Sequence, residues 1–356
     1  MLPFFTERFG NAASRTHTFG WEAEQTVKNA RQQTAQLFGC EEQEVIFTSG
    51  STEAINLAIK GVFEAYKSKG KHIVTLATEH KAVLDTCKHL EKQGAEITVL
   101  PVMRDGLLNT DLLRSSIRTD TILVCVMLAN NETGVIQPMQ SIAEIVHQKN
   151  SILFSDTTQA FGKIAVDVNE MGIDLACMSA HKFYGPKGVG ALFVRRKDPR
   201  VTLIAQMDGG GHERNLRSGT LNVPGIVGLG AACELAGKEF WDNASRISVL
   251  RSKLEQLLTE NNAAFVIGNI KSRLPNTTNL CFPGIRATEL IKKLPDLAIA
   301  TGSACSSALP EPSHVLLAMG LTEKEAYASV RISLGKFNTE EEVLLAGEKI
   351  AKATKE

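Results

Sequence analysis

The segment Ser179-Ala180-His181-Lys182 combines a hydroxyl, an imidazole and an amine, which are the groups that covalent amine chemistry uses. It follows the apolar run of residues 173–178, which predicts a buried strand. An ammonium at the end of a buried strand is partly desolvated, and desolvation lowers the pKa of a lysine and makes its amine nucleophilic. Lys182 is therefore a candidate for Schiff-base formation. A solvated lysine at a strand end is the structural alternative, and the segment alone leaves both open.

Four other polar clusters follow predicted strands, and they comprise residues 49–52, 78–80, 130–131 and 156–159. Strands and helices alternate through this part of the chain, which predicts an α/β fold with a mostly parallel, buried sheet flanked by helices. Ligands bind beyond the carboxyl ends of the strands in such sheets. We therefore expect these clusters to gather with Lys182 at one edge of the sheet.

Two of the clusters suit a charged, phosphorylated ring. Ser51 and Thr52 open a predicted helix, where backbone N–H groups and the helix dipole form an anion site. A plain N-cap assisted by Glu53 is the alternative. Asp156, with Gln159 beyond it, follows a buried strand, where a carboxylate can hold a protonated ring nitrogen and make a pyridine ring an electron sink. A helix cap explains Asp156 equally well.

Three further features have a chemical and a structural interpretation. His80 either stacks on a flat cofactor and moves protons near neutral pH, or is structural. Residues 209–220 begin with three glycines and continue with arginines and hydroxyls, so they form either a phosphate clamp or a mobile loop. Arg331 lies in a predicted apolar strand and needs an anion there, which is either a substrate carboxylate or an internal Asp or Glu.

Cys305 lies in a segment of small residues, 300–310, that lacks bulky neighbours to bury a thiol. We therefore expect it to be accessible, and accessible thiols are the reactive ones. The other six cysteines lie in apolar or helical contexts and are expected to be inert: Cys40, Cys87, Cys125, Cys177, Cys233 and Cys281.

The bulk composition excludes several classes of protein. The 356 residues include 39 Lys plus Arg against 39 Asp plus Glu, so the chain resembles neither a nucleic-acid-binding nor a membrane-surface polycation. No apolar run reaches transmembrane length, and the N-terminus has no secretion signal. The seven cysteines form no C-x-x-C pair, which argues against disulfides and structural zinc and favours the cytoplasm. We expect no metal site.

The hydrophobic pattern changes near Phe240. A long amphipathic helix over residues 244–259 is followed by short strands and helices. The sequence therefore predicts two domains: a large domain over residues 1–240, and a smaller α+β domain over residues 241–356 that carries the cysteine segment.

With these residues in order, the chain resembles the class V pyridoxal-phosphate enzymes of fold-type I, and within them the cysteine desulfurases of the NifS and IscS type. The similarity runs from Phe9 to about Val343. The segment around Cys305 is similar to that of the members that assemble iron–sulfur clusters. The motifs that carry the resemblance are Thr78-Glu79-His80-Lys81-Ala82-Val83, Asn130-Asn131-Glu132-Thr133-Gly134, Ser179 to Gly188, residues 209–220 and Gly302-Ser303-Ala304-Cys305.

The resemblance implies that pyridoxal 5'-phosphate is bound covalently by Lys182. Asp156 would pair with the ring nitrogen, Gln159 would lie on the side of the ring hydroxyl, and His80 would stack on the ring. Thr220 would reach the phosphate from the second subunit of a homodimer. The cofactor-binding residues implied are Ser51, Thr52, His80, Asn131, Asp156, Gln159, Ser179, His181, Lys182 and Thr220.

The resemblance further implies a sulfurtransferase that converts L-cysteine to L-alanine. Lys182, His80 and Cys305 would be catalytic, with a persulfide forming on Cys305, and Asn131 and Arg331 would bind the substrate. The sulfur would serve iron–sulfur cluster assembly on a scaffold protein, or tRNA thiolation through another acceptor. No direct nucleic-acid or membrane contact is implied.

Two alternatives stay open. One is a selenocysteine lyase or another class V enzyme, although an aminotransferase has no use for a thiol at Cys305. The other is a protein that binds the cofactor but has impaired turnover. Relatives have a further N-terminal strand and turn before the position of Phe9, and a longer C-terminal tail that contacts the scaffold. The sequence given has neither, so either another element takes the place of the N-terminal stretch or turnover is impaired, and the C-terminus gives no support for a scaffold contact.

Overall fold

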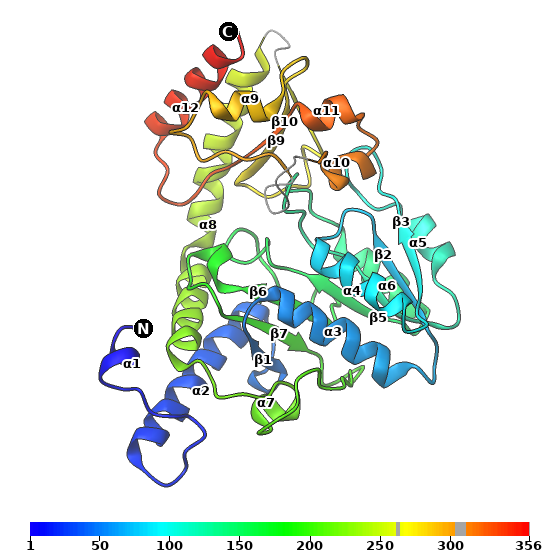
Figure 1. Ribbon diagram of the computed structural model, residues 1–356, viewed down its shortest axis with the longest axis vertical. Helices are drawn as coiled ribbons and strands as arrows, with labels where there is room; N and C mark the ends of the chain where they lie inside the picture. Colours follow the sequence, from blue (N-terminus) through cyan, green and yellow to red (C-terminus); the bar gives the residue numbers. More distant parts are fainter. Residues whose placement is uncertain (261–263, 303–310, 356) are drawn as a thin grey trace.

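The computed structural model describes residues 1–260, 264–302 and 311–355, which form two packed bodies joined by one long helix (Figure 1). The elements of the larger body are α1 (Pro3–Thr6), α2 (Thr18–Phe38), η1 (Glu42–Glu44), β1 (Val45–Thr48), α3 (Ser51–Tyr66), β2 (His72–Leu76), α4 (Lys81–Glu91), β3 (Glu96–Leu100), α5 (Thr110–Ser116), β4 (Thr121–Cys125), α6 (Met139–Gln148), β5 (Ile152–Asp156), β6 (Leu175–Ser179), η2 (Ala180–Phe183), β7 (Gly190–Val194) and α7 (His212–Asn215). The joining helix and the second body comprise α8 (Val223–Thr259), β8 (Phe265–Val266), β9 (Thr277–Cys281), α9 (Ala287–Lys292), α10 (His314–Ala318), α11 (Glu323–Tyr327), β10 (Ser329–Ser333) and α12 (Glu340–Ala353).

A seven-stranded sheet of order β1-β7-β6-β5-β4-β2-β3 forms the centre of the larger body. The pairs from β6 to β3 are all parallel, and β7 is antiparallel to both of its neighbours. Six of the seven strands are buried along their whole length, because helices cover both faces. The predicted α/β fold with a mostly parallel sheet is confirmed.

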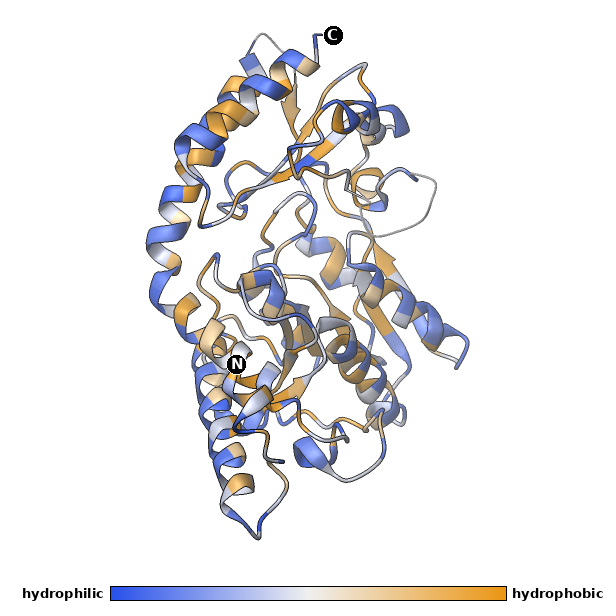
Figure 2. Cartoon of the chain, turned by 60° about the vertical axis from the view of Figure 1, so that its left-hand side comes forward, coloured by the Kyte–Doolittle hydropathy of each residue, from blue (hydrophilic) through white to orange (hydrophobic). Residues whose placement is uncertain are grey.

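Alternate residues of each strand face opposite sides of the sheet, so the sheet has two hydrophobic cores. In β1, Val45 and Phe47 pack in the core formed with α2, α6 and α8, whereas Ile46 packs in the core formed with α3 and α4. Figure 2 shows the apolar strands enclosed by helices along which polar and apolar residues alternate. Because helices cover both faces of the sheet, the ends of the strands are the part of it where a ligand can bind.

The second body is built on a three-stranded antiparallel sheet of order β10-β9-β8, which packs with α9, α12 and the end of α8. Because α8 runs without a break through both bodies, the predicted boundary between residues 240 and 241 falls inside this helix. The division into two domains stays a prediction. In the described ranges, no helix combines the length and the apolar character needed to cross a membrane.

The predicted glycine-rich loop contains a short left-handed turn that is tied to the sheet. Glu213, Arg214 and Asn215 have φ values of 46°, 59° and 63°, a conformation that costs residues with a Cβ about 1–2 kcal/mol each. Glu213 compensates through its carboxylate, which accepts bonds from both Nη atoms of Arg31 at 2.8 and 2.6 Å and from the Phe47 amide at 2.7 Å. This buried ion pair therefore fixes the segment between β7 and α8.

Arg31→Met is expected to lower the free energy of unfolding by about 3–5 kcal/mol, because the buried Glu213 carboxylate loses its cation. The Glu213 side chain is only 1% exposed. Urea denaturation followed by circular dichroism measures the change. Arg8→Met is the matched control, because it removes an ion pair with Glu22 whose partners are about half exposed, and it should cost less than about 1 kcal/mol. Equal losses in the two variants would contradict the anchoring role.

Candidate active site

Three of the predicted polar clusters, those of residues 49–52, 156–159 and 179–182, meet at the carboxyl ends of β1, β5 and β6. Thr48 and Ser179 end their strands opposite the same residue, Gly190 of β7. A Cβ on Gly190 would lie 2.3 Å from the Met178 carbonyl oxygen and 2.7 Å from Gly50 Cα, so only glycine lets the turn after β1 pack against β7. This close approach brings the start of α3 beside the end of β6.

The N-terminus of α3 is lined by hydroxyls. Its N-cap, Gly50, has φ 151° and provides no side-chain bond to the first turn. The hydroxyl of Ser51 lies 2.9 Å from that of Ser179 and 2.6 Å from that of Thr158, and the Ser51 amide donates to Ser179 Oγ at 2.8 Å. Thr52 is exposed beside them. The backbone N–H groups and hydroxyls can together bind a phosphate.

Glu53 does not cap the helix end. Its carboxylate accepts a bond from the Ser49 amide at 2.8 Å and pairs with Arg217 Nε at 2.8 Å. The Arg217 guanidinium and the Ser49 bonds lower the pKa of Glu53, although its burial works in the opposite direction. The plain N-cap assisted by Glu53, which the sequence left open, is therefore not what the structure shows.

Asp156 is a buried carboxylate with one oxygen available. It ends β5 and is 5% exposed. Both bonds to it in the described part of the chain reach Oδ1, from the Thr158 amide at 3.0 Å and from Cys177 Sγ at 3.4 Å. Thr158 also links Asp156 to the Ser51 hydroxyl. Among the described residues Asp156 has no cationic partner, and only Thr158 separates it from the start of α3, an arrangement that suits a ring with a positive nitrogen and a phosphate.

Lys182 lies on the 3₁₀ turn η2 immediately after β6, and its side chain is exposed. The expectation that its ammonium is partly desolvated by the strand is therefore wrong for the chain by itself, because the turn carries the residue beyond the sheet. His181, also exposed, has its pKa lowered by partial burial and by the nearby Lys182 and Lys187. The two residues thus border the site from its open side.

Sequence reasoning missed Lys163, which lies in the turn after β5. Its ammonium donates to Gln159 Oε1 at 2.7 Å and to the Gln159 carbonyl at 3.0 Å. Burial, followed by the charges of Lys182 and Arg331, lowers the pKa of Lys163 to about 7. The spacing of four residues from Gln159 was the available signal, but a lysine in an irregular turn gives no indication of its burial.

His80 is exposed at the start of α4, where its Nδ1 accepts a bond from the Ala82 amide at 3.1 Å. This bond is the structural role that the sequence left open, and because it uses Nδ1 it leaves Nε2 for another partner. The preceding residue, Glu79, is fully buried, accepts a bond from the Met127 amide at 2.6 Å, and has its pKa raised by burial. Glu79 therefore helps to fix the turn that presents His80.

The second body contributes Arg331, from β10. Its guanidinium donates to the Asn131 carbonyl at 2.9 Å, so in the described residues the bonding partner of Arg331 is a backbone oxygen and not an internal carboxylate. Asn131 itself is half-buried in the loop after β4. Arg331, Lys163 and Lys182 are close enough for their charges to interact. Three cations in one region can attract an organic anion.

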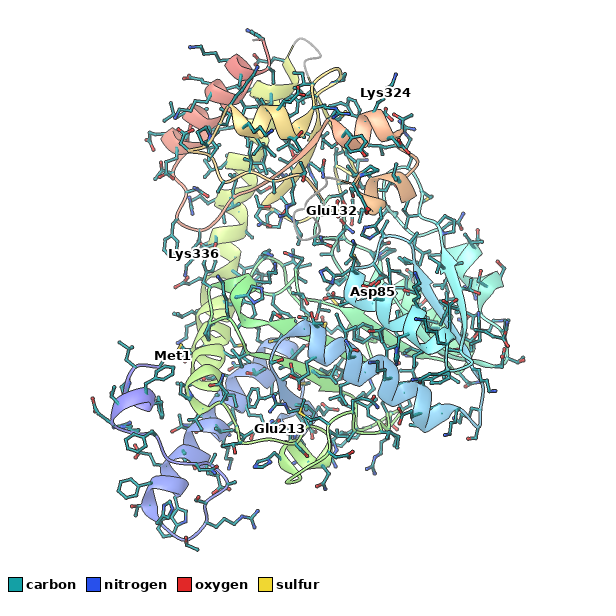
Figure 3. The ribbon with its side chains drawn as sticks, in the orientation of Figure 1. Met1, Asp85, Glu132, Glu213, Lys324 and Lys336 are labelled. Atoms are coloured by element: carbon teal, nitrogen blue, oxygen red, sulfur yellow. The ribbon has the colours of Figure 1, made fainter. Side chains whose placement is uncertain are left out.

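Glu132, labelled in Figure 3, lies where the loop after β4 approaches the second body. Its carboxylate accepts a bond from the Ser313 hydroxyl at 2.5 Å, and its backbone carbonyl accepts one from Asn279 at 3.2 Å. Burial raises the pKa of Glu132, against the opposing effect of His314 and Arg331. These bonds fix the two bodies relative to each other beside Arg331.

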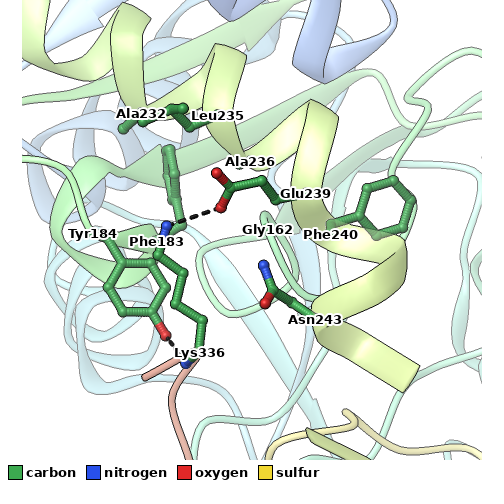
Figure 4. A pocket seen from close by; sticks show the side chains of 10 residues that line it. All are labelled: Gly162, Phe183, Tyr184, Ala232, Leu235, Ala236, Glu239, Phe240, Asn243 and Lys336. Atoms are coloured by element: carbon green, nitrogen blue, oxygen red, sulfur yellow. Dashed lines mark hydrogen bonds and ion pairs between the residues drawn. The ribbon is translucent and has the colours of Figure 1, made fainter. Parts of the chain in front are cut away.

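Contacts around a small pocket next to η2 also connect the two bodies (Figure 4). Lys336 bonds Glu239 of α8 at 2.9 Å, and its backbone amide donates to the Tyr184 hydroxyl at 2.7 Å. Tyr184 directly follows η2, so this contact ties the Lys182 turn to the second body.

The remaining predicted residues are placed as follows. Thr220 is exposed on the segment between α7 and α8. Cys305 lies outside the described residues, so the structure does not test its role. Among the described residues there is no group of three or more His, Cys, Asp or Glu side chains that could hold a metal ion.

Comparisons with known proteins show the family to which this chain is similar. The family model described as aminotransferase class-V matches residues 1–345. The cysteine desulfurase IscS of Anaeromyxobacter dehalogenans (strain 2CP-C) is 51% identical over 99% of this chain and 88% of its own length. A solved structure of a NifS-like protein has a TM-score of 0.92 and 39% identity, covering 99% of this chain and 93% of that one. The structure of SspA in complex with cysteine has a TM-score of 0.82 and 34% identity, covering 95% and 94%.

The chain therefore belongs to the class V aminotransferase family and, within it, to the cysteine desulfurases of the NifS and IscS type. The resemblance drawn from the motifs is confirmed, and so is the fold class. The family identifies the chain as a pyridoxal-phosphate-dependent enzyme.

Proposed function

We propose that this chain converts L-cysteine to L-alanine and transfers the sulfur to Cys305. The observation that carries the proposal is the meeting of three features at one edge of the sheet: Lys182, the buried carboxylate of Asp156, which has no cationic partner among the described residues, and the uncapped N-terminus of α3. The relative named cysteine desulfurase and the solved relative in complex with cysteine support the choice of substrate.

The residues present fit pyridoxal 5'-phosphate. The start of α3, with the hydroxyls of Ser51, Thr52 and Ser179 and the ring of His181, would hold the phosphate. Asp156 would pair with the ring nitrogen through its available oxygen. When bound, this cofactor supplies an electron sink for the bonds at the α-carbon of an amino acid.

Other side chains would fix the cofactor ring. Gln159 and Asn131 would lie on the side of the ring hydroxyl, and His80 would stack on the ring while its Nδ1 keeps its bond to the Ala82 amide. Lys182 would bind the cofactor covalently through its amine, which its exposure leaves accessible.

The chain's own residues would divide the reaction among them. Arg331 holds the substrate carboxylate, with Asn131 beside it. The Lys182 amine, released when the amine of the substrate takes its place, would take the proton from the substrate α-carbon, and His80 would move a second proton. The Cys305 thiolate then attacks the substrate sulfur, so that an S–S bond forms and the Cβ–S bond breaks. Its electron pair ends in a C–H bond of alanine, for which one proton is taken up.

We further propose that the working unit is a homodimer. The first 21 residues expose several large apolar side chains, and an exposed apolar surface of this kind indicates an interface with another protein chain. The exposed fractions are 80% for Leu2, 60% for Phe5, 75% for Phe9, 67% for Phe19 and 52% for Trp21. Thr220 is exposed in the single chain, which leaves it available to the phosphate site of a partner subunit.

The sulfur acceptor is proposed to be an iron–sulfur scaffold or another acceptor protein, which follows from the name of the IscS relatives. The six cysteines that the structure describes are free thiols, which supports the cytoplasm as a reducing location.

The test is to supply the purified chain with pyridoxal phosphate, L-cysteine and a thiol reductant, and to measure sulfide and alanine. We expect the two products in equal amounts. Formation of a keto acid without sulfide would identify an aminotransferase instead. A kcat/KM for L-selenocysteine at least tenfold above that for L-cysteine would identify a selenocysteine lyase. Cofactor binding without either product would identify an impaired enzyme.

A further inference from the structure

Lys163 makes two hydrogen bonds to a single residue of the site. Its Nζ donates to the Gln159 side-chain oxygen at 2.7 Å and to the Gln159 backbone carbonyl at 3.0 Å. The side chain is half-buried, and in the described part of the chain it forms no ion pair with a carboxylate. Because one bond reaches the backbone of Gln159 and the other reaches its side chain, Lys163 restricts the conformation of both.

The bond to Oε1 decides which way the Gln159 amide faces. A glutamine amide has an acceptor at one end and two donors at the other. If the amide were turned over, its NH₂ group would face the lysine amine, and two donors would meet. Lys163 therefore favours the orientation in which Oε1 faces the turn and Nε2 is directed away from it.

Electrostatics place Lys163 beside the proposed site. The charges that lower its pKa, after burial, are those of Lys182 on η2 and Arg331 on β10. These two residues come from different bodies, so Lys163 lies in the region where they meet. An amine keeps N–H groups in its neutral and its protonated form, so either form can donate to Gln159.

We propose that Lys163 is a positioning residue that holds the Gln159 amide so that Nε2 donates to the hydroxyl on the pyridoxal ring. The inference rests on the proposed function, because it requires that cofactor at this site. It assigns to Lys163 a part in cofactor binding that acts through another side chain.

The test is a double-mutant cycle on the full-length chain with Lys163→Met, Gln159→Ala and both together. The readouts are the dissociation constant for pyridoxal phosphate and the visible absorption spectrum of the bound cofactor. We expect Lys163→Met to weaken binding about tenfold, in the range of a lost charge-assisted hydrogen bond, and to give the spectrum of Gln159→Ala. The double variant should bind no more weakly than Gln159→Ala alone.

Two further variants separate this role from a structural one. Lys163→Arg keeps a cationic donor and should restore binding to within about threefold of the unchanged chain. Lys238→Met, which removes an exposed lysine paired with Glu234 on α8, is the matched control and should leave binding and spectrum unchanged. Additive losses in the cycle, or a Lys163→Met spectrum identical to that of the unchanged chain, would overturn the inference. If the unchanged chain binds no pyridoxal phosphate, the proposed function itself fails.

Discussion

Lys182→Ala is expected to abolish sulfide release and the visible absorbance of bound pyridoxal phosphate. The variant loses the amine that binds the cofactor and the base that takes the substrate proton. Acid–base catalysis by one positioned side chain contributes about 10²–10⁴-fold, and loss of covalent binding adds to that, so activity should fall by at least about 10⁴-fold. Absorbance spectra and a sulfide assay on the same preparation measure both effects.

Lys187→Ala is the matched control for this experiment. Lys187 is an exposed lysine five residues further along the chain, in the loop between η2 and β7, and its charge also acts on His181. Its removal should leave the colour and the activity within about twofold of the unchanged chain, as is usual for surface positions. If Lys182→Ala keeps the full colour and Lys187→Ala loses it, the covalent role belongs to Lys187.

Lys182 shows what a sequence pattern can and cannot predict about a site. The apolar run before it fixes the strand, and the topology of a parallel sheet fixes which edge receives the polar residues, so their gathering was predictable. The exposure of Lys182 was not, because it depends on how the 3₁₀ turn η2 leaves the sheet. The burial of Lys163 was hidden for the same reason: it depends on how the irregular turn after β5 folds back onto Gln159, which no local pattern reports.

Helix α8 shows the same limit at the level of the fold. The amphipathic pattern of residues 244–259 predicted its second half, but the glycine-rich first half gave no helical signal. The structure explains these glycines by close helix packing: a Cβ on Gly230 would lie 2.7 Å from Ala30 Cα of α2. A glycine that costs helix propensity in isolation is retained here because another backbone lies against it.

Arg331 shows an alternative that the sequence leaves open and that the structure only narrows. The sequence pattern predicted that Arg331 lies in an apolar strand and needs an anion as a partner. It did not predict whether this anion is a side chain of the protein or a ligand. Arg331 bonds a carbonyl and no carboxylate in the described residues, but its charge acts on the Glu132 carboxylate as well as on Lys163, so an internal anion and a ligand both stay possible counterions. The position of Arg331 in β10 does not identify a ligand; the choice of L-cysteine depends on the relatives.

Cys305→Ser is expected to eliminate persulfide formation on the protein while leaving the binding of pyridoxal phosphate intact. The structure supports Cys305 by what it shows of the other cysteines, because five of the remaining six are buried and the sixth, Cys40, is only partly exposed. A thiol must be deprotonated to attack sulfur. Burial raises the pKa of the thiols of Cys40, Cys125, Cys177, Cys233 and Cys281.

Mass spectrometry of the intact protein after a single turnover with L-cysteine measures the persulfide as one added sulfur atom. Cys40→Ser is the matched control, since Cys40 is the least buried of the cysteines that the structure describes, and this variant should keep the added sulfur. Because Lys182 and Asp156 are unchanged in Cys305→Ser, its cofactor spectrum should match that of the unchanged chain. An added sulfur in Cys305→Ser that is lost in Cys40→Ser would transfer the acceptor role to Cys40 and remove Cys305 from the reaction.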